Sequence, residues 1–452
     1  MAKQAAKRRR KEEDGSIISM DRISELPQHI LQHILSFLSQ REAIQTCVLS
    51  KSWRYLGSTR PRFRVSEEYG FKGNKETFLA FLDKTLQGYN DQKLCIREFI
   101  VWMSMVDSES VSLLEKWLPM ITLNMGVKIL NLKFLSEASP YFDVPSIVFE
   151  AGSLQKLYLG RCKLNQNSSD KVLFKHLQTL DLSQVYIADE TFDKIISSCP
   201  LIEDLGLHGC EGLKTIKVNK LHKYLKDFDF FGYELYKEHE DDTSIEIDAP
   251  IEAIKIEGCR NWFHHHNYYF SNLKYLCLNK VRLSTKSFDY FSRNFPCLEE
   301  LELYYCYGFK NSAIVIDAPN IVKFEYRGDM PQSISFTTTF TEWKSTIVVL
   351  CDAFLNCLFR VCRPRNISQC WYLDAHNDWQ RKEEKLIEFL VEILLIERDM
   401  RQHFWRQDLE EVSVEVFDEN GKQWHPVQGT GLSEYQFYQR IRFRLKWREL
   451  EG

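Results

Sequence analysis

A short phrase of apolar residues recurs through the middle of the chain and restricts the possible folds more than any other feature. It reads apolar-x-x-apolar-x-apolar, and after the first copy the copies begin 22 to 27 residues apart. The copies begin at Ile96, Val127, Leu154, Leu177, Ile202, Leu225, Ile251, Leu273, Leu298 and Ile321. Repetition at such a period indicates a stack of similar coils, because one coil cannot bury its own apolar face.

The phrase also predicts the local structure of each coil. Its last three positions alternate at period two, which is typical of a short strand whose apolar side chains point into the stack. Between two of these strands, Phe192, Ile195 and Ile196 have helical spacing. The period lies in the range of leucine-rich repeats. We therefore predict an α/β repeat fold, a solenoid over residues 66–345 whose parallel sheet lines a concave side.

A longer repetition strengthens this prediction. The segment that begins at Leu177 matches the segment that begins at Leu273 at a constant offset of 96 residues. The matched pairs are Phe192 with Phe288, Pro200 with Pro296, Glu203 with Glu299, Cys210 with Cys306, Gly212 with Gly308, and Gly232 with Gly328. Four coils thus form one larger repeat, and chance is a poor explanation for so regular a match.

The cysteines follow the repeat rather than a metal-site pattern. Four of them close a copy of the phrase: Cys162, Cys210, Cys259 and Cys306. We expect these thiols to be buried as small apolar side chains. Thirteen cysteines without a secretory signal favour reduced thiols. Neither His264–His266 nor the later cysteines have the spacing of a zinc site, so we expect no metal. The sequence has no Gly-rich phosphate loop and no Gly-x-Ser-x-Gly elbow, and we expect no cofactor.

The N-terminal segment Asp21–Pro61 carries a helical pattern instead. Leu26-Pro27 precedes a stripe of apolar residues, namely Ile30, Leu31, Ile34, Leu35 and Leu38. Proline suits the first turn of a helix, where its missing N–H would have no partner. A second helical pattern leads into the string Val48-Leu49-Ser50-Lys51-Ser52-Trp53-Arg54. About forty residues bury too little apolar surface to stand alone, so this hairpin needs a neighbour.

This segment, assigned to residues 21–65, resembles the F-box. The resemblance is carried by Leu26-Pro27, the periodic helix and the string ending in Trp53-Arg54. It implies a substrate receptor of a Skp–cullin–F-box ubiquitin ligase, with a Skp-type adaptor, a cullin complex and a protein substrate as partners, and with the bond-forming chemistry in other subunits. We expect the adaptor contact to include Leu26, Pro27, Ile30, Leu31, Ile34, Leu35, Val48 and Trp53, with Trp53 also holding the hairpin together.

The alternative is a repeat scaffold outside the ubiquitin pathway whose N-terminal helices are only a cap. The Leu26-Pro27 opening and the Trp53-Arg54 close favour the F-box, because a mere cap would not require them. A small-molecule co-receptor role stays open.

The C-terminal residues 346–452 are expected to be a terminal repeat and cap. Lys382–Arg398 has a helical pattern, and Leu409, Val412 and Val414 look like one more strand phrase. Residues 418–421 predict a hairpin turn, since Asn-Gly tolerates positive φ, and Ile441–Trp447 predicts a last strand. This region resembles the C-terminal region of plant F-box proteins with leucine-rich repeats.

Charge narrows the choice of partners. The chain has a formal net charge of −4 although six of its first eleven residues are basic, so the rest is more acidic than the whole. Such a body is not a general nucleic-acid binder. Within the tail of residues 1–20, Lys7–Lys11 is either a nuclear import signal or a solvated run, and we expect the nucleus and cytoplasm. The best candidate for a membrane span, Leu386–Ile396, is too short and is interrupted by Glu388 and Glu392, so we expect no membrane span.

The strand register predicts a substrate surface. Residues between the inward apolar positions face outward, and from the Leu177 coil to the Leu298 coil every Lys, Arg, Asp or Glu among them is acidic except Lys255. The outward residues chosen as substrate contacts are Tyr158, Asp181, Asp204, His208, Asp229, Glu257, Glu300, Glu302 and Tyr304. We expect a basic substrate segment on this acidic strip. The alternative is that solvated strands tolerate charge of either sign.

Overall fold

The computed structural model describes residues 26–38, 40–46, 53, 60–136, 138, 140–165, 171–232, 243–259, 262, 269–283, 287–288, 291–308, 312–327, 333–336, 344–348, 366–368, 409–418, 423–427 and 441–448. It falls into two compact units, Met1–Leu177 and Gln178–Gly452. Several predicted features lie outside the described residues, namely Lys7–Lys11, Val48, His264–His266, the cysteines from Cys351 to Cys370, and Lys382–Arg398.

The first unit begins with the predicted helical hairpin. Helix α2 (Gln28–Ser36) starts directly after Pro27, whose carbonyl accepts the backbone N–H of Ile30 at 2.9 Å. Helix α3 (Gln40–Gln45) follows. Leu31, Leu35, Ala43 and Trp53 form the buried core of the hairpin, and Leu26, Ile34 and Leu38 pack against it. The predicted structural role of Trp53 is therefore confirmed.

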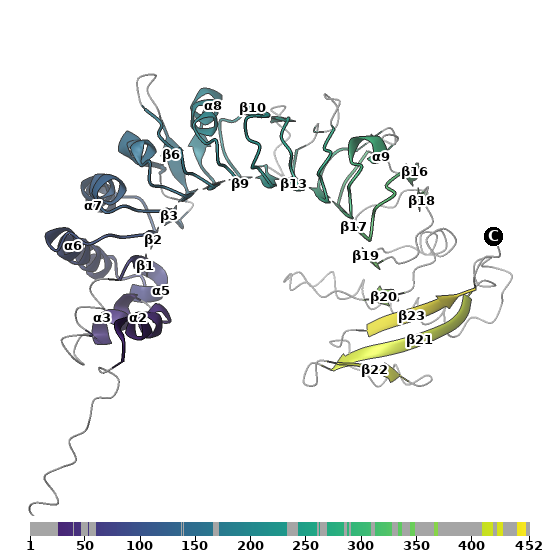
Figure 1. Cartoon of the computed structure of the whole chain (residues 1–452), viewed down its shortest axis with the longest axis horizontal. Helices are drawn as coiled ribbons and strands as arrows, with labels where there is room; N and C mark the ends of the chain where they lie inside the picture. Colours follow the sequence, from purple (N-terminus) through teal and green to yellow (C-terminus); the bar gives the residue numbers. More distant parts are fainter. Residues whose placement is uncertain are drawn as a thin grey trace, which may run out of the picture. The chain divides into compact units, whose positions relative to one another are not determined.

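A parallel sheet continues the first unit. Its strands pair in the order β1 (Arg62–Ser66), β2 (Glu98–Met103), β3 (Ile129–Phe134) and β5 (Lys156–Gly160). Helices α5 (Glu67–Phe71), α6 (Lys75–Asp91) and α7 (Ser108–Pro119) lie between them in the chain, and Figure 1 shows α6 and α7 side by side. Asn74 and Asp107 cap α6 and α7 through their side chains. Since β1 begins at Arg62, the sheet starts before the predicted boundary at residue 66.

The remaining elements of the first unit are short. Strand β4 (Phe142–Asp143) pairs in parallel with β6 (Cys162–Leu164). A π-helical turn spans Met120–Asn124, and a 3-10 helix spans Ser146–Glu150. Phe149 of this turn is buried and packs on Phe174, with ring centroids 5.9 Å apart. These pieces lie outside the main sheet and complete the coils between its strands.

The second unit repeats the same architecture. Its main sheet is parallel, in the order β7 (Thr179–Ser183), β9 (Asp204–His208), β11 (Asp227–Phe231), β13 (Ala253–Glu257), β14 (Tyr275–Asn279), β15 (Glu300–Tyr304), β17 (Lys323–Arg327) and β19 (Lys344–Val348). Two short parallel sheets accompany it, β10 (Thr215–Val218) with β12 (Ser244–Ile247), and β16 (Ala313–Ile316) with β18 (Ser333–Phe336). Strand β8 (Tyr186–Ile187) and helices α8 (Asp189–Ser197) and α9 (Phe291–Asn294) connect the coils.

The predicted register is confirmed for the ten copies of the phrase from Ile96 to Tyr326. Every inward position of the apolar phrase, from Ile96 in the first copy to Tyr326 in the last, is buried. Phe192, Ile195 and Ile196 face the core from α8, as their spacing predicted. Of the cysteines that close the phrase, Cys162, Cys259 and Cys306 are buried, as expected, but Cys210 is partly exposed. No helix in the part of the chain described here is long and apolar enough to cross a membrane.

Near the C-terminus the described strands form a separate antiparallel sheet. Its order is β20 (Asn366–Ser368), β23 (Ile441–Trp447), β21 (Leu409–Asp418) and β22 (Gln423–Val427). The predicted hairpin is confirmed, since Asp418 pairs with Gln423. The prediction that Leu409, Val412 and Val414 add a further repeat strand is wrong, because β21 pairs with both neighbours in the antiparallel sense. A parallel neighbour would need a crossover far longer than residues 419–422.

Candidate functional site

The first candidate surface lies on the N-terminal hairpin. Pro27 and Ile30 are exposed, and Phe37, with 77% of its surface exposed, stacks edge-on against His33 with ring centroids 5.0 Å apart. Ile30 and Phe37 are seven residues apart, so they lie on the same face of the helix. We call Pro27, Ile30 and Phe37 the hairpin patch.

The expected adaptor contacts divide into two groups in the structure. Pro27 and Ile30 belong to the hairpin patch, and Leu26 and Ile34 are partly buried. Leu31, Leu35 and Trp53 instead fill the hairpin core, so they are not part of its exposed surface. Their roles in binding remain predictions. Phe37 was not among the expected contacts, although its seven-residue spacing from Ile30 is visible in the sequence.

The second candidate surface is the outward face of the main sheet in the second unit. Pairing of the strands aligns its outward side chains in three rows. The first row is Thr179, Asp204, Asp227, Ala253, Tyr275, Glu300 and Lys323. The second is Asp181, Gly206, Asp229, Lys255, Cys277, Glu302 and Glu325. The third is Ser183, His208, Phe231, Glu257, Asn279 and Tyr304.

These rows bring together all but one of the predicted substrate contacts. The exception is Tyr158, which lies on β5 of the first unit opposite Asn131. The predicted acidic strip is present, but Lys323 pairs with Glu300 and Glu302, and Lys280 pairs with Glu257. Lys323 lies in the copy of the phrase that begins at Ile321, one coil beyond those from which the acidic strip was predicted. Extending the predicted register by that one strand would have placed Lys323 beside Glu300.

Around Lys323, polar side chains form a closed network. The Lys323 ammonium lies 2.7 Å from Glu302, 3.3 Å from Glu325 and 3.4 Å from Glu300. The Tyr275 hydroxyl donates to Glu302 at 2.7 Å, and the Tyr304 hydroxyl donates to Glu325 at 2.6 Å. We call these six residues the Lys323 network. Its carboxylates have partners within the protein and are poor sites for a ligand cation.

The electrostatics of the Lys323 network agree with its geometry. Burial opposes ionisation of Glu302, but hydrogen bonds from Lys323 and Tyr275 outweigh it and hold the pKa of Glu302 below its usual range. Burial alone would lower the pKa of Lys323, but its hydrogen bond and charge contact with Glu302 raise it. Burial, reinforced by the bond to Glu325, raises the pKa of Tyr304. The network therefore holds a charged Lys and ionised Glu at neutral pH.

On strands β7 to β11 of the same face, the carboxylates are arranged differently from those of the Lys323 network. Asp204 and Asp227 are direct neighbours across two strands, and Asp229 is the next outward residue on β11. Among the residues that the structure describes, no Lys or Arg forms an ion pair with these three carboxylates, which we call the Asp cluster. Asp204 accepts a hydrogen bond from the Thr179 hydroxyl at 3.0 Å. Burial, followed by the neighbouring Asp204, raises the pKa of Asp227.

His208 completes this part of the face. Its Nε2 atom lies 3.6 Å from Asp229 Oδ2, and its Nδ1 atom lies 4.0 Å from Asp181 Oδ1. The His208 ring can lie between the carboxylates of Asp229 and Asp181 because the preceding outward residue on β9 is Gly206, which has no side chain. A Cβ atom on Gly206 would come within 3.3 Å of both Asp181 and His208.

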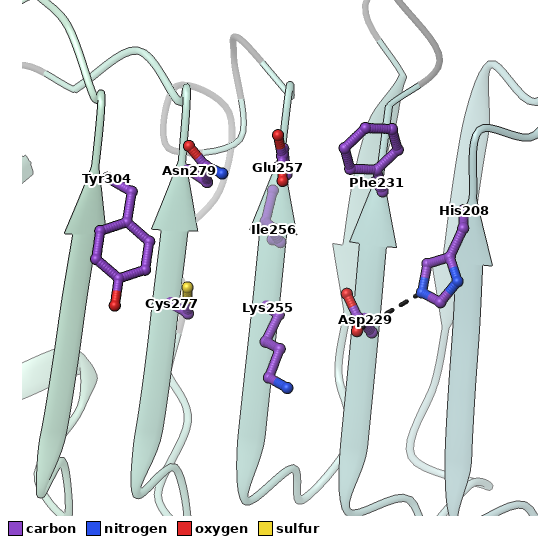
Figure 2. A pocket seen from close by; sticks show the side chains of 9 residues that line it. All are labelled: His208, Asp229, Phe231, Lys255, Ile256, Glu257, Cys277, Asn279 and Tyr304. Carbon is purple, nitrogen blue, oxygen red and sulfur yellow. Dashed lines mark ion pairs between the residues drawn. The ribbon is translucent and has the colours of Figure 1, made fainter. Parts of the chain in front are cut away.

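A depression of about 400 Å³ lies between the Asp cluster and the Lys323 network. Its lining residues are His208, Asp229, Phe231, Lys255, Ile256, Glu257, Cys277, Asn279 and Tyr304 (Figure 2). Glu257 is paired with Lys280 at 3.3 Å, and the Lys255 ammonium lies 5.7 Å from the centre of the Tyr275 ring. The Oδ1 atom of Asn279 is buried and has no hydrogen-bond partner. We call this hollow the sheet depression.

The sequence singled out His208, Asp229, Glu257 and Tyr304, but it did not single out Phe231, Cys277 or Asn279 as lining residues. Each occupies an outward position, so the register would have placed them on this face. That the face is hollow there depends on side-chain conformations, which the pattern does not contain. Within the described ranges, no group of three or more His, Cys, Asp or Glu residues is arranged to hold a metal ion.

Comparisons with known proteins agree with this architecture. The family model for the F-box domain matches residues 23–64, and the model for the repeats of FBD-associated F-box protein At5g56370 matches residues 114–238. Arabidopsis thaliana F-box/LRR-repeat protein 25 is 32% identical over 203 residues, which are 45% of this chain and 73% of that protein. F-box/FBD/LRR-repeat protein At1g13570 of the same plant is 33% identical over 273 residues, 53% of this chain and 60% of that protein.

A third relative, F-box/LRR-repeat protein At3g59200 of Arabidopsis thaliana, is 32% identical over 248 residues, 52% of this chain and 45% of that protein. For this and similar relatives, the match spans less than half of their length. F-box proteins with leucine-rich repeats are generally adaptors without a catalytic domain. The F-box match, the repeat match and the 73% coverage of F-box/LRR-repeat protein 25 show that the chain belongs to the F-box/LRR-repeat family.

Proposed function

We propose that this chain is the substrate-recognition subunit of a Skp–cullin–F-box ubiquitin ligase. It binds a Skp-type adaptor through its hairpin and a protein substrate through its repeats, and the cullin complex then brings the machinery that ubiquitinates the substrate and marks it for degradation. Membership of a family that typically acts in such complexes supports this role.

The observation that carries the proposal is the hairpin patch. Phe37 is 77% exposed, and Ile30 beside it is also exposed. Exposed apolar side chains gathered on one helix favour a protein partner. The buried Leu31, Leu35 and Trp53 keep the helix rigid, which lowers the cost of binding.

Adaptor binding tests the proposal directly. The double variant Ile30→Ala with Phe37→Ala should lose about 2 kcal/mol or more of binding free energy, about 30-fold in Kd. The double variant Leu26→Ala with Pro27→Ala should also fail to co-purify with the adaptor. Tyr69→Ala is the matched control, because Tyr69 is likewise 77% exposed but lies on α5 outside the hairpin.

Circular dichroism and a thermal melt of each variant would show whether the repeats remain folded. Undiminished adaptor binding by both double variants would refute the docking role. Loss of binding in Tyr69→Ala as well would mean that the effect is not specific to the hairpin patch.

We also propose that Lys7–Lys11 directs nuclear import, giving a protein of the nucleus and cytoplasm. The support is an unbroken basic cluster outside any helical or strand pattern. Changing all five residues to Ala in a fluorescent fusion should shift the protein to the cytoplasm. An unchanged distribution would leave only the solvated-tail interpretation.

A further inference from the structure

We propose that the outward sheet face of β9–β15 binds an extended basic segment of the substrate. An apolar side chain of that segment enters the sheet depression, and a neighbouring Lys or Arg lies over the Asp cluster. This inference rests on the proposed function, because it names the class of substrate that the repeats receive.

Charge complementarity favours a cationic ligand group only on the side of the depression that carries the Asp cluster. Asp204 and Asp227 face each other across adjacent strands, which lie about 4.8 Å apart in any sheet. Like charges at that separation repel, and burial together with Asp204 raises the pKa of Asp227. A bound cation would relieve this repulsion. On the other side, the carboxylates of the Lys323 network already contact Lys323.

The depression itself fits part of a peptide. Its volume of about 400 Å³ is at the small end of ligand pockets, which span about 300–1,000 Å³. Figure 2 shows Phe231 on one side and Tyr304 on the other, with Cys277 between them on the neighbouring strand. Aromatic rings and a thiol suit an aromatic or large aliphatic side chain. The Lys255 ammonium disfavours a second cation at the centre of the hollow.

Asn279 supplies an independent observation. Its Oδ1 atom is buried without a hydrogen-bond partner, and the side chain lines the depression. Buried acceptors nearly always have a donor, and this oxygen lacks one. A small turn of the amide would let it accept a backbone N–H from a bound peptide. Glu257 cannot attract the ligand cation equally well, because Lys280 is already 3.3 Å away.

The spacing of the strands fixes the order of side chains in the ligand. Asp229, on β11, is the member of the Asp cluster that borders the depression, and the central strands of the depression, β13 and β14, lie about 5–10 Å from β11. Residues two apart in an extended chain are about 7 Å apart and point to the same side. The preferred pattern is therefore a basic residue, any residue, and then an apolar residue, or the reverse order.

A defined peptide tests the inference. The probe is a fluorescein-labelled nine-residue Gly/Ser peptide with Arg, Phe and Arg at alternate central positions. Two companions replace both Arg by Glu, or Phe by Ser. We call the first peptide Arg-Phe, the peptide with Ser in place of Phe Arg-Ser, and the third the Glu peptide. Fluorescence polarisation with the full chain should show the highest affinity for Arg-Phe, a lower affinity for Arg-Ser, and no binding of the Glu peptide. Affinity should fall with added salt, because exposed charges are screened over about 8 Å at physiological ionic strength.

Two variants separate the parts of the site. Asp204→Asn with Asp229→Asn should weaken the Arg-Phe peptide at least tenfold and keep its preference over Arg-Ser. Phe231→Ala should remove that preference and keep the salt dependence. Glu246→Gln is the control. The Glu246 side chain is 39% exposed, similar to the 45% of Asp229, but it lies on β12, outside the main sheet, and pairs with Lys217. It should bind the peptide like the parent protein.

The inference is overturned if no peptide binds at about 1 mM, if the Glu peptide binds as well as the Arg peptide, or if the Asp variants bind like the parent. Adaptor binding by the same preparations keeps the two proposals apart. Loss of peptide binding with intact adaptor binding would refute only this inference. Loss of adaptor binding with intact peptide binding would refute only the ligase role.

Discussion

Residues 177–231 and 273–327, the matching first parts of the two copies of the larger repeat, agree on one side of the sheet and differ on the other. Their inward residues match and are buried, as in Leu180 and Leu276, Leu205 and Leu301, and Phe228 and Phe324. Their outward residues diverge at the same offset of 96: Asp181 corresponds to Cys277, Gly206 to Glu302, His208 to Tyr304, and Asp227 to Lys323. The buried residues that define each coil are thus alike in the two copies, whereas these exposed residues differ in charge and polarity.

One of these differences has the largest consequence. In the first copy Asp227 lies beside Asp204, whereas in the second Lys323 lies beside Glu300 at the same register position. The Asp pair leaves a negative surface open to a ligand. The Lys323 network satisfies its carboxylates internally. A change of sign at a single repeat position thus separates a candidate binding surface from a structural one.

The two copies share a glycine that both require, and replacing it should have the largest effect. Gly212 and Gly308 have φ of +90° and +104°. A Cβ at Gly212 would lie 2.8 Å from the carbonyl oxygen of Ile187, and one at Gly308 would come closer still to that of Leu283. Gly308→Ala should lower the free energy of unfolding by about 3 kcal/mol, and Gly212→Ala by somewhat less, measured by urea unfolding.

Gly88→Ala is the control for these variants. Gly88 lies inside helix α6 with no atom within 4 Å of an added Cβ. This variant should gain about 0.5–1 kcal/mol, because alanine favours a helix more than glycine does. If Gly308→Ala were equally harmless, the coil could not depend on that backbone conformation.

Removing the cation of the second copy should have the next largest effect. Lys323→Met should lower the free energy of unfolding by about 2 kcal/mol, less than the ~3–5 kcal/mol of a fully buried pair because the Lys323 side chain is 33% exposed. Lys274→Met, which removes an exposed pair with Glu252, should cost about 0.5 kcal/mol or less. Urea unfolding at pH 7 measures both, and equal losses would contradict a special role for the network.

The pH dependence of the same variant has a definite sign. Glu302 has a lowered pKa in the folded protein, so its stabilising contribution is present above the usual Glu pKa of about 4.3 and is lost as pH falls through the lowered value. Lys323 has a raised pKa, so its contribution is present below the usual Lys value and is lost as pH rises through the raised one. The difference between parent and Lys323→Met should therefore shrink in acid, and a constant difference would contradict the assignment.

Relieving the repulsion of the first copy should have a small effect of the opposite sign. Asp227→Asn should raise the free energy of unfolding at pH 7 by about 0.5 kcal/mol at most, since the site is exposed. Because the folded pKa of Asp227 is raised, the gain should appear as pH rises through that value and vanish below the usual Asp pKa of about 3.9. Thermal melts at pH 3 and pH 7 distinguish this result from a gain that is independent of pH.

The smallest expected difference concerns the matched thiols. Cys210 donates to the carbonyl of Leu182 at 3.4 Å, and Cys306 donates to that of Leu278 at 3.3 Å. Burial raises the pKa of each thiol to about 12. Cys306 is buried but Cys210 is partly exposed, so a maleimide should label Cys210 faster than Cys306, and both more slowly than exposed Cys297. Mass spectrometry of peptides after short labelling measures the order.

The sequence by itself determined the coil, its register and the hairpin helix. Periods of two and 3.6 residues are local properties of strands and helices, so the pattern predicted which side chains of each strand face the core. The burial of Phe192 and of every phrase position follows from that local rule. The same rule predicted that Asp181, Glu257 and Tyr304 share one face with the Asp cluster.

Only the tertiary structure decided which outward groups meet. Lys323 and Glu302 are 21 residues apart and contact each other because stacked coils bring their strands together. It likewise placed Leu31 inside the hairpin, by packing it with Trp53, and turned β21 into an antiparallel strand. The physical reason is that a local period fixes the face on which a side chain lies, whereas its partner depends on strand pairing, rotamers and the reach of side chains from other coils.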